Sequence, residues 1–176
     1  MKYESNLILR TILAILVTGL YNFFYLIFTP ATIYSSWILL KVLGYDIGVF
    51  GNNLVFSNVN FIFIEACVAL SAYYLLFLLI VFTKGLSLKT SLKLLVVGTA
   101  LILVMNIIRI DLLIILFLEA GKTYFDVVHM IFWKFIAGIY VALVWIVMVR
   151  KFKIKSIPIY SDLKELYDKS LFRRKK

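Results

Sequence analysis

Four long apolar runs constrain the fold of this chain more than any other feature of its sequence. They cover residues 7–28, 61–82, 94–118 and 128–149. A helix needs about 20 apolar residues to cross the hydrocarbon core of a bilayer, and each run reaches that length. The chain is 64% hydrophobic with a mean hydropathy of +1.02, whereas apolar residues make up roughly half of a soluble domain. The sequence therefore predicts an all-α integral membrane protein, a bundle of about four transmembrane helices.

The first run is expected to remain as an anchor, because no small-residue cleavage site of the kind that ends a signal peptide follows it. Residues 1–149 should then form a single membrane domain, followed by a basic tail over residues 150–176. Within the tail, residues 161–172 fit either an amphipathic helix on the inner leaflet or a frayed basic segment.

The basic residues predict how the spans are oriented. Most of the 19 lysine and arginine residues lie near the N-terminus, in the loop after the second run and in the tail. Cytoplasmic segments carry such an excess of positive charge, so both termini should be cytoplasmic and the acidic-leaning loops should face outward. This topology accounts for the net charge of +10 without a nucleic-acid partner, and attraction to anionic lipids is a secondary effect. We therefore expect a multi-pass protein of the cell membrane.

The segment between the first two runs, residues 29–60, is expected to be an outer loop. After Pro30, residues 31–43 are apolar but too few to cross a bilayer upright. Their aromatic residues predict a helix that lies in the membrane interface and ends at Gly44.

Residues 46–63 have the composition of β-structure. Apolar side chains are separated by glycine and asparagine, and Gly51-Asn52-Asn53 fits a hairpin turn. The sequence predicts a small extracytoplasmic β-hairpin-like loop, with a loop without strands as the alternative.

A cysteine, a histidine and an intramembrane arginine fall at one depth of the predicted bundle. With the helical rise per residue, Cys67 lies about 26 Å, Arg109 about 24 Å and His129 about 32 Å from the cytoplasmic boundary. The hydrocarbon core is about 30 Å thick, so all three should reach the outer interface from different spans. The chain has a single cysteine and a single histidine, which excludes an internal disulfide. A protein metal site is not expected, and neither is a cofactor.

Each of the three residues has an ordinary explanation when taken alone. A lone cysteine in an apolar helix is usually a small buried hydrophobe. A single histidine at a helix start is usually an interfacial residue, and an arginine near a span end can extend its charge to the headgroups.

Neighbouring polar residues are candidates for supporting roles. Asn106 lies one turn before Arg109 on the same helix face, and Ser71 lies one turn after Cys67. Such side chains also join helices by hydrogen bonds without any catalysis. Two carboxylates near the same layer are candidates to pair with the arginine: Glu65, and Asp111, for which solvation at the interface is the favoured alternative.

Together, a thiol, an imidazole and a guanidinium are the groups needed for acyl transfer by a cysteine nucleophile. The thiolate is the reactive form of a thiol, and a neighbouring cation favours it. His129 can take the thiol proton and later protonate a leaving amine. Arg109 can stabilise either the thiolate or the oxyanion of the tetrahedral intermediate, and the sequence leaves both roles open.

Three short motifs follow one another in the order and spacing of a known enzyme family. They are the hairpin of residues 44–67 ending in Glu65-Ala66-Cys67, the Asn-x-x-Arg pair Asn106 and Arg109, and Val128-His129-Met130. Over roughly residues 43–149 the chain resembles the exosortase/archaeosortase family of membrane transpeptidases, and most of all its small archaeal members, the pacearchaeosortases. Many members follow the cysteine with Ser-Gly or a similar small pair, where this chain has Val68-Ala69.

The resemblance implies a catalytic Cys67, Arg109 and His129 facing the extracytoplasmic side. It implies cleavage of secreted proteins that end in a short motif, a hydrophobic span and a basic cluster. A thioester acyl-enzyme would pass the protein to an amine-bearing acceptor, expected to be a membrane lipid, and a protease that hydrolyses without transfer is a variant of this chemistry. The alternative is a small non-enzymatic membrane transport or assembly subunit, with a structural Cys67 and a helix-packing Arg109.

Overall fold

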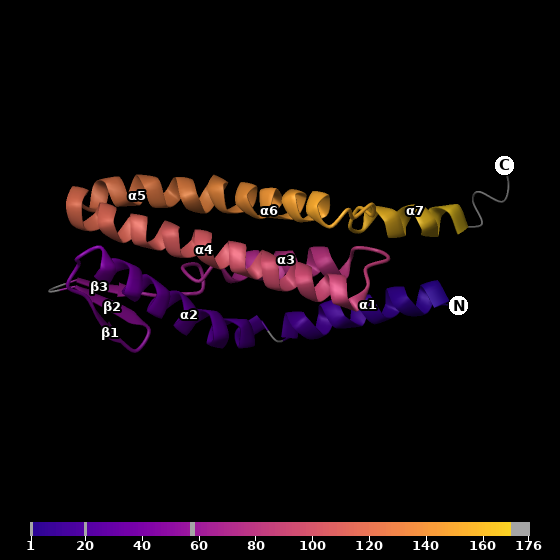
Figure 1. Ribbon diagram of the computed structural model, residues 1–176, viewed down its shortest axis with the longest axis horizontal. Helices are drawn as coiled ribbons and strands as arrows, with labels where there is room; N and C mark the ends of the chain where they lie inside the picture. Colours follow the sequence, from indigo (N-terminus) through magenta and orange to yellow (C-terminus); the bar gives the residue numbers. More distant parts are fainter. Residues whose placement is uncertain (1, 20, 57–58, 170–176) are drawn as a thin grey trace.

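The computed structural model describes residues 2–19, 21–56 and 59–169 as a long, mostly helical molecule (Figure 1). Its helical elements are α1 (Lys2–Gly19), α2 (Tyr21–Val42), α3 (Leu70–Val81), α4 (Leu88–Ala120), α5 (Lys122–Ile131), the π-helical turn η1 (Phe132–Ile136), α6 (Ala137–Lys151) and α7 (Tyr160–Lys169). Its strands are β1 (Gly48–Phe50), β2 (Asn53–Phe56) and β3 (Val59–Ile62). Within the described residues, three helical segments are long and apolar enough to cross a membrane: Asn22–Val42, Leu88–Ala120 and Lys122–Lys151.

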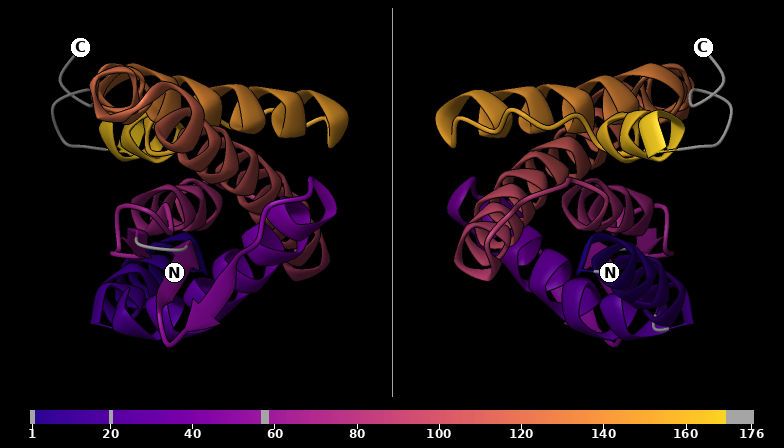
Figure 2. Two further views of the ribbon diagram at one scale, coloured as in Figure 1. Left: turned by 90° about the vertical axis from the view of Figure 1, so that its left-hand side faces the viewer. Right: turned by 90° about the vertical axis from the view of Figure 1, so that its right-hand side faces the viewer.

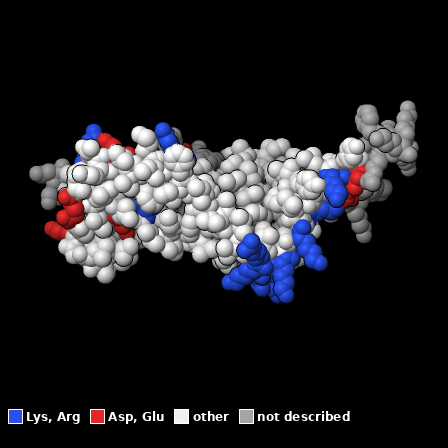
Figure 3. All heavy atoms as spheres, turned by 90° about the horizontal axis from the view of Figure 1, so that it is seen from above, with Lys and Arg blue, Asp and Glu red and all other residues white. Residues whose placement is uncertain are grey.

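The helices lie in three layers. α3 and α4 occupy the middle, with α5, η1 and α6 on one side and α1 and α2 on the other (Figures 1 and 2). The sheet and the α4–α5 turn are at one end of the molecule, while the start of α1, the α3–α4 loop and α7 are at the other. On the face shown in Figure 3, acidic side chains gather at the sheet end and the largest group of lysine and arginine side chains lies further along the molecule. A helical molecule with apolar segments of this length fits a membrane protein.

The first apolar run is helical on both sides of residue 20, which falls outside the described residues: residues 7–19 lie in α1 and residues 21–28 lie in α2. α2 continues through Pro30 to Val42, so the predicted break at this proline and the separate interfacial helix over residues 31–43 are wrong. A proline removes one backbone hydrogen bond, but membrane helices tolerate it because surrounding groups satisfy the freed carbonyl. Gly44 ends α2 as predicted, with a φ of 92° that favours glycine.

The second apolar run is only partly helical. β3 and a turn over residues 63–69 occupy its first part, and α3 contributes 12 residues. The strands predicted within residues 46–63 are present as a three-stranded antiparallel sheet of order β1-β2-β3, one strand more than a hairpin. Gly51, with a φ of 57°, lies in the β1–β2 turn, and the β2–β3 turn falls outside the described residues. Pairing between strands satisfies their backbone groups, so this segment does not need to be helical.

The third and fourth apolar runs lie inside helices, as predicted. α4 contains residues 94–118, and the path from α5 to α6 contains residues 128–149. The Ser87 side chain caps α4 by accepting a hydrogen bond from the Thr90 N–H at 3.2 Å. Gly121, with a φ of 86°, separates α4 from α5.

Two groups of buried apolar residues surround the turn between β3 and α3. The first lies among α2, the sheet and α4 and comprises Ile33, Leu40, Ile47, Leu54, Phe56, Phe63, Ile110 and Ile114. The second lies among α3, α4 and α6 and comprises Tyr73, Leu76, Ile80, Leu94, Ile102, Val144 and Met148. Because both groups share α4, this helix holds the turn against the rest of the molecule.

The tail forms a helix up to residue 169 that contacts α1 and the α3–α4 loop, so the frayed alternative does not describe this part of it. Asp162 of α7 accepts a hydrogen bond from the Arg10 guanidinium at 3.0 Å. Glu165 forms an ion pair with Lys84 in the α3–α4 loop. The predicted amphipathic helix is therefore present as α7, and residues 170–172 of the prediction fall outside the described residues.

Candidate active site

Cys67 lies in the turn that joins β3 to α3, whereas the depth estimate assumed a helix. Its N–H donates to the Ile64 carbonyl at 2.9 Å. Two residues later Ala69 has a left-handed backbone, with φ 57° and ψ 36°, and α3 starts from it. The thiol is partly exposed, and its sulfur is 4.0 Å from the Ile62 carbonyl oxygen. A strand, a sharp turn and a helix in this order present the side chain at the turn.

Two polar side chains of α4 hold this turn in place. The Asn106 Nδ2 donates to the Cys67 carbonyl at 2.8 Å. The Arg109 Nη2 donates to the carbonyls of Ala66 and Cys67 at 3.0 and 3.2 Å. Asn106 is 3% exposed, and its loss would leave a buried carbonyl with fewer donors. The face of α4 that carries Asn106 and Arg109 thus holds the backbone of Cys67 in place by hydrogen bonds.

A cavity of about 130 Å³ brings the three predicted residues together. Cys67, Arg109 and His129 all line it, from the turn, α4 and α5 respectively. The rest of its wall is apolar and consists of Phe61, Ile62, Phe63, Ile110, Leu113, Ile114 and Phe125. The estimate from residue counts predicted that the three side chains come together, and they line one cavity. That estimate gave no information about the direction in which each side chain points.

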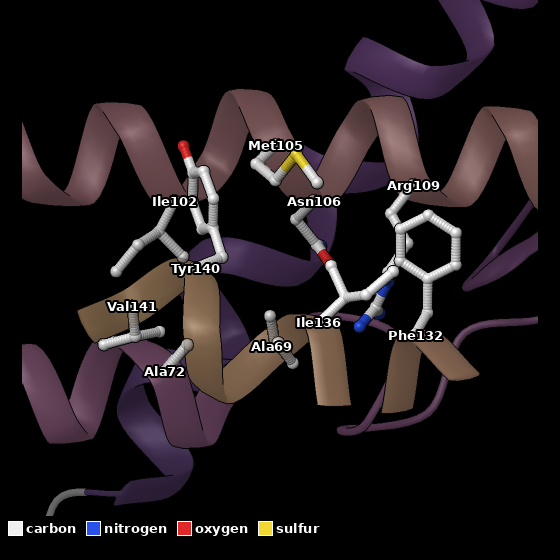
Figure 4. A pocket seen from close by; sticks show the side chains of 11 residues that line it. Ala69, Ala72, Ile102, Met105, Asn106, Arg109, Phe132, Ile136, Tyr140 and Val141 are labelled. Carbon is white, nitrogen blue, oxygen red and sulfur yellow. The ribbon is translucent and has the colours of Figure 1, made fainter. Parts of the chain in front are cut away.

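A second, smaller cavity lies on the other side of Arg109, among α3, α4, η1 and α6 (Figure 4). Its volume is about 30 Å³, and the small side chains Ala69, Ala72 and Ala137 make room for it. The Asn106 and Arg109 side chains reach toward it (Figure 4), and the Asn106 Oδ1 is buried without a hydrogen bond. One water needs at least about 10–15 Å³ and two polar partners, so this space suits a single water.

The other predicted supporting residues are not brought to the cavity. Glu65 and Ser71 are exposed on the turn and on α3, and neither is among the residues that line the two cavities. The hydrogen bonds of Arg109 go to backbone carbonyls instead of to Glu65. An exposed carboxylate is solvated at little cost, whereas the carbonyls of a buried turn need a protein donor.

Asp111 differs most from its predicted environment. The sequence favours solvation at the interface, but its side chain is 3% exposed. Ser36 of α2 is the neighbouring hydroxyl, although neither carboxylate oxygen has a hydrogen bond of good geometry. Buried hydroxyls at Thr29, Thr32 and Ser36 recur at helical spacing on α2. This regular spacing was the signal in the sequence that one face of α2 is buried and packs against polar side chains.

Phe125 is a cavity residue that the sequence analysis did not single out. It lies one helical turn before His129, and the two rings stack with centroids 5.3 Å apart and planes at 26°. The spacing of four residues between two flat rings on one helix was the available signal.

Comparison with family models, curated proteins and solved structures identifies no relative of this chain. Within residues 2–19, 21–56 and 59–169, no group of three or more His, Cys, Asp and Glu side chains is placed to hold a metal ion. No family model, no curated protein and no solved structure matches the chain, so the family resemblance rests on the sequence motifs together with the cavity.

Proposed function

We propose that this protein is a membrane-embedded cysteine transpeptidase of the exosortase/archaeosortase type. One observation carries the proposal: the only cysteine and the only histidine of the chain line the same cavity as a half-buried arginine. These groups come from three elements far apart in the sequence. A structural role for the turn accounts for the arginine beside the cysteine, but it does not require the histidine to line the same cavity.

In the proposed reaction His129 takes the proton of the Cys67 thiol, and the thiolate attacks the carbonyl carbon of the scissile peptide bond. The new carbon–sulfur bond places a negative charge on the carbonyl oxygen. As the tetrahedral intermediate collapses, the carbon–nitrogen bond breaks and His129 returns its proton to the leaving amine. A thioester remains. An acceptor amine then attacks it, gives its proton to His129, and releases Cys67.

Arg109 fits the oxyanion role better than a direct pairing with the thiolate. Its Nη2 is held by two backbone carbonyls of the turn, and its buried Nε has no partner. A donor fixed in advance beside the reacting carbon is the arrangement that stabilises a developing oxyanion. The same two hydrogen bonds keep Arg109 at a fixed distance from the cysteine.

The topology that goes with this proposal has the cavity facing outward and both termini in the cytoplasm. In that arrangement α1 with α2, the strand-and-α3 segment, α4 and α5 with α6 cross the membrane in turn. The start of α1 and α7 lie at the same end of the molecule, opposite the sheet (Figure 1). The excess of basic residues at that end supports the orientation.

The proposed substrates are secreted proteins that end in a short motif, a hydrophobic span and a basic cluster. Such a span would enter from the bilayer, which suits a cavity with mostly apolar walls. The proposed acceptor is an amine-bearing membrane lipid, and water would make the protein a protease instead. Mass spectrometry of the new C-terminus of a processed protein distinguishes these two products.

The first experiment needs no substrate. Because the chain has one cysteine, iodoacetamide labels a single site, and its rate at pH 7 reports the thiolate. We expect His129→Gln to slow the reaction by a large factor, since general bases typically contribute about 10²–10⁴-fold. Phe135→Leu is a matched control because Phe135 is 63% exposed on the adjoining turn. A wild-type thiol that reacts only after unfolding contradicts the proposal.

The second experiment uses the native host. Cys67→Ala, His129→Gln and Arg109→Lys are expected to accumulate unprocessed secreted proteins while the variant remains in the membrane. Full processing by Cys67→Ala would show that another group is the nucleophile.

A second candidate function has its own supporting observation. The hydrogen bonds of Arg109 and of Asn106 all go to the turn backbone, as a structural role in a non-enzymatic transport or assembly subunit would require. In that case Cys67 is a packing residue, and His129→Gln does not change its alkylation rate at any pH.

A further inference from the structure

Among the described residues, the imidazole of His129 stacks on an aromatic ring and has no hydrogen-bond partner. Catalytic histidines are commonly held by a third group, usually a carboxylate that accepts a hydrogen bond from the ring. Asp126 lies one turn away on α5, but the ion pairs between described residues do not include it or His129. The specific contact that the structure gives to the imidazole is its stacking on Phe125.

Phe125 is itself held by a row of edge-to-face aromatic contacts. Phe117 of α4 meets Phe125 at 5.6 Å and 89°, and Phe61 of β3 meets Phe117 at 5.4 Å and 86°. Phe56 and then Tyr45 continue the row at 6.1 and 5.9 Å. Edge-to-face pairs favour one relative orientation of their rings, so the sheet and α4 fix the plane of Phe125.

We propose that Phe125 is the positioning residue of His129, in the place that a carboxylate holds in other cysteine and serine enzymes. The inference rests on the function proposed above. Both rings line the cavity that contains Cys67, so a stack that restricts rotation of the imidazole also fixes how the imidazole is presented to that cavity. The face of Phe125 also attracts an imidazolium more than a neutral imidazole, which favours proton transfer from the thiol.

This arrangement suits the environment of the site. A carboxylate beside His129 at the membrane surface would have to be desolvated along with the substrate. An aromatic ring supplies orientation and a modest attraction for the cation without that desolvation cost. The aromatic row therefore connects the outer sheet to the proton-transferring residue.

The test compares Phe125→Leu with the conservative variant Phe125→Tyr and with the control Phe135→Leu. The protein is purified in lipid nanodiscs with labelled histidine, so that its single imidazole gives one set of NMR signals. Iodoacetamide labelling of Cys67 is followed against pH in the same samples. We expect Phe125→Leu to move the imidazole signals and to slow labelling at pH 7 by about 2- to 30-fold, the factor that a cation–π contact corresponds to. Phe125→Tyr should retain both properties.

Three outcomes overturn the inference. Imidazole signals and a pH profile that are unchanged in Phe125→Leu would show that the stack does not position His129. Equal losses in Phe125→Leu and Phe125→Tyr would show that the aromatic ring is not the cause. Equal effects of Phe125→Leu and Phe135→Leu would point to a general structural change. A different result would refute the proposed function itself: the wild-type thiol is inert, while the imidazole signals still respond to Phe125→Leu. The stack would then have no role in catalysis.

Discussion

Replacing Ala69 by glycine should stabilise the protein, even though it removes a methyl group next to the turn that carries Cys67. Ala69 has φ 57° and ψ 36°, a left-handed conformation that costs a residue with a Cβ about 1–2 kcal/mol and costs glycine almost nothing. The fully buried neighbours Val68 and Leu70, at 0% and 1% exposure, leave the backbone no freedom to relax. Ala69 therefore carries strain in the folded state.

The expected gain is smaller than this strain because glycine also makes the unfolded chain more flexible. That effect costs about 0.4–1 kcal/mol, which leaves a net stabilisation of about 0.5–1 kcal/mol. For a chain of 150–250 residues each kcal/mol shifts the unfolding temperature by about 2–4 °C. Ala69→Gly should therefore raise the midpoint by about 1–4 °C, measured by thermal unfolding in detergent or nanodiscs.

Ala100 provides the matched control, since it is exposed in the middle of α4. Glycine in a helix interior costs about 1 kcal/mol relative to alanine, so Ala100→Gly should lower the midpoint. The reasoning is refuted if Ala69→Gly lowers the midpoint as Ala100→Gly does, because Ala69 would then behave as an ordinary helical residue. A stabilised Ala69→Gly would also account for the glycine of the Ser-Gly pair that follows the cysteine in many members of the resembling family, where this chain departs with Val68-Ala69.

Two further predictions concern the packing around the site. A Cβ at Gly98 would lie 2.7 Å from the Leu76 Cδ2 and 3.0 Å from the Met148 Cε. Overpacking costs about 1–3 kcal/mol and alanine gains about 1 kcal/mol over glycine in a helix, so Gly98→Ala should destabilise the bundle by up to about 2 kcal/mol in an unfolding titration; a stabilised variant would show that the ends of the Leu76 and Met148 side chains move aside at little cost. Asp111 is buried, and the ion pairs between described residues do not include it. Asp111→Asn should therefore be at least as stable as the wild type at pH 8, because a buried carboxylate either keeps an uncompensated charge or takes up a proton, and a neutral amide of similar shape needs neither. A loss of more than about 1 kcal/mol in Asp111→Asn would indicate an ionised carboxylate with a partner.

The fold was predictable wherever local chemistry decides the conformation. Long apolar runs predicted α4 and the α5–α6 path, and asparagine and glycine among β-formers predicted strands before Cys67. Gly44 ended its helix as expected. Pro30 did not, because the preference against proline in a helix is measured in water, and a membrane removes the water that would hydrate an opened backbone.

That the three site residues come together was predictable, but the direction of each side chain was not. Counting residues at a helical rise placed Cys67, Arg109 and His129 in one layer, and the three line one cavity although Cys67 lies in a turn just before α3 begins. Which face of each element points inward depends on packing. Asp111, two residues after Arg109, points to α2 while Arg109 points to the turn, because successive residues on a helix are about 100° apart.

The need of backbone carbonyls for hydrogen-bond donors explains why polar side chains lie around this turn whether or not it is catalytic. Irregular backbone at membrane depth needs protein donors for its carbonyls, and Asn106 with Arg109 supplies them. A change at Arg109 therefore disturbs the turn and the proposed chemistry together, so loss of activity in Arg109→Ala does not separate an enzyme from a structural subunit. His129 has no hydrogen bond to the turn among the described contacts, and it is exposed on its outer side. His129→Gln should leave the free energy of unfolding within about 0.5 kcal/mol of the wild-type value and still slow alkylation of Cys67. An unchanged alkylation rate in a fully stable His129→Gln protein would favour the structural role of the cluster over the catalytic one.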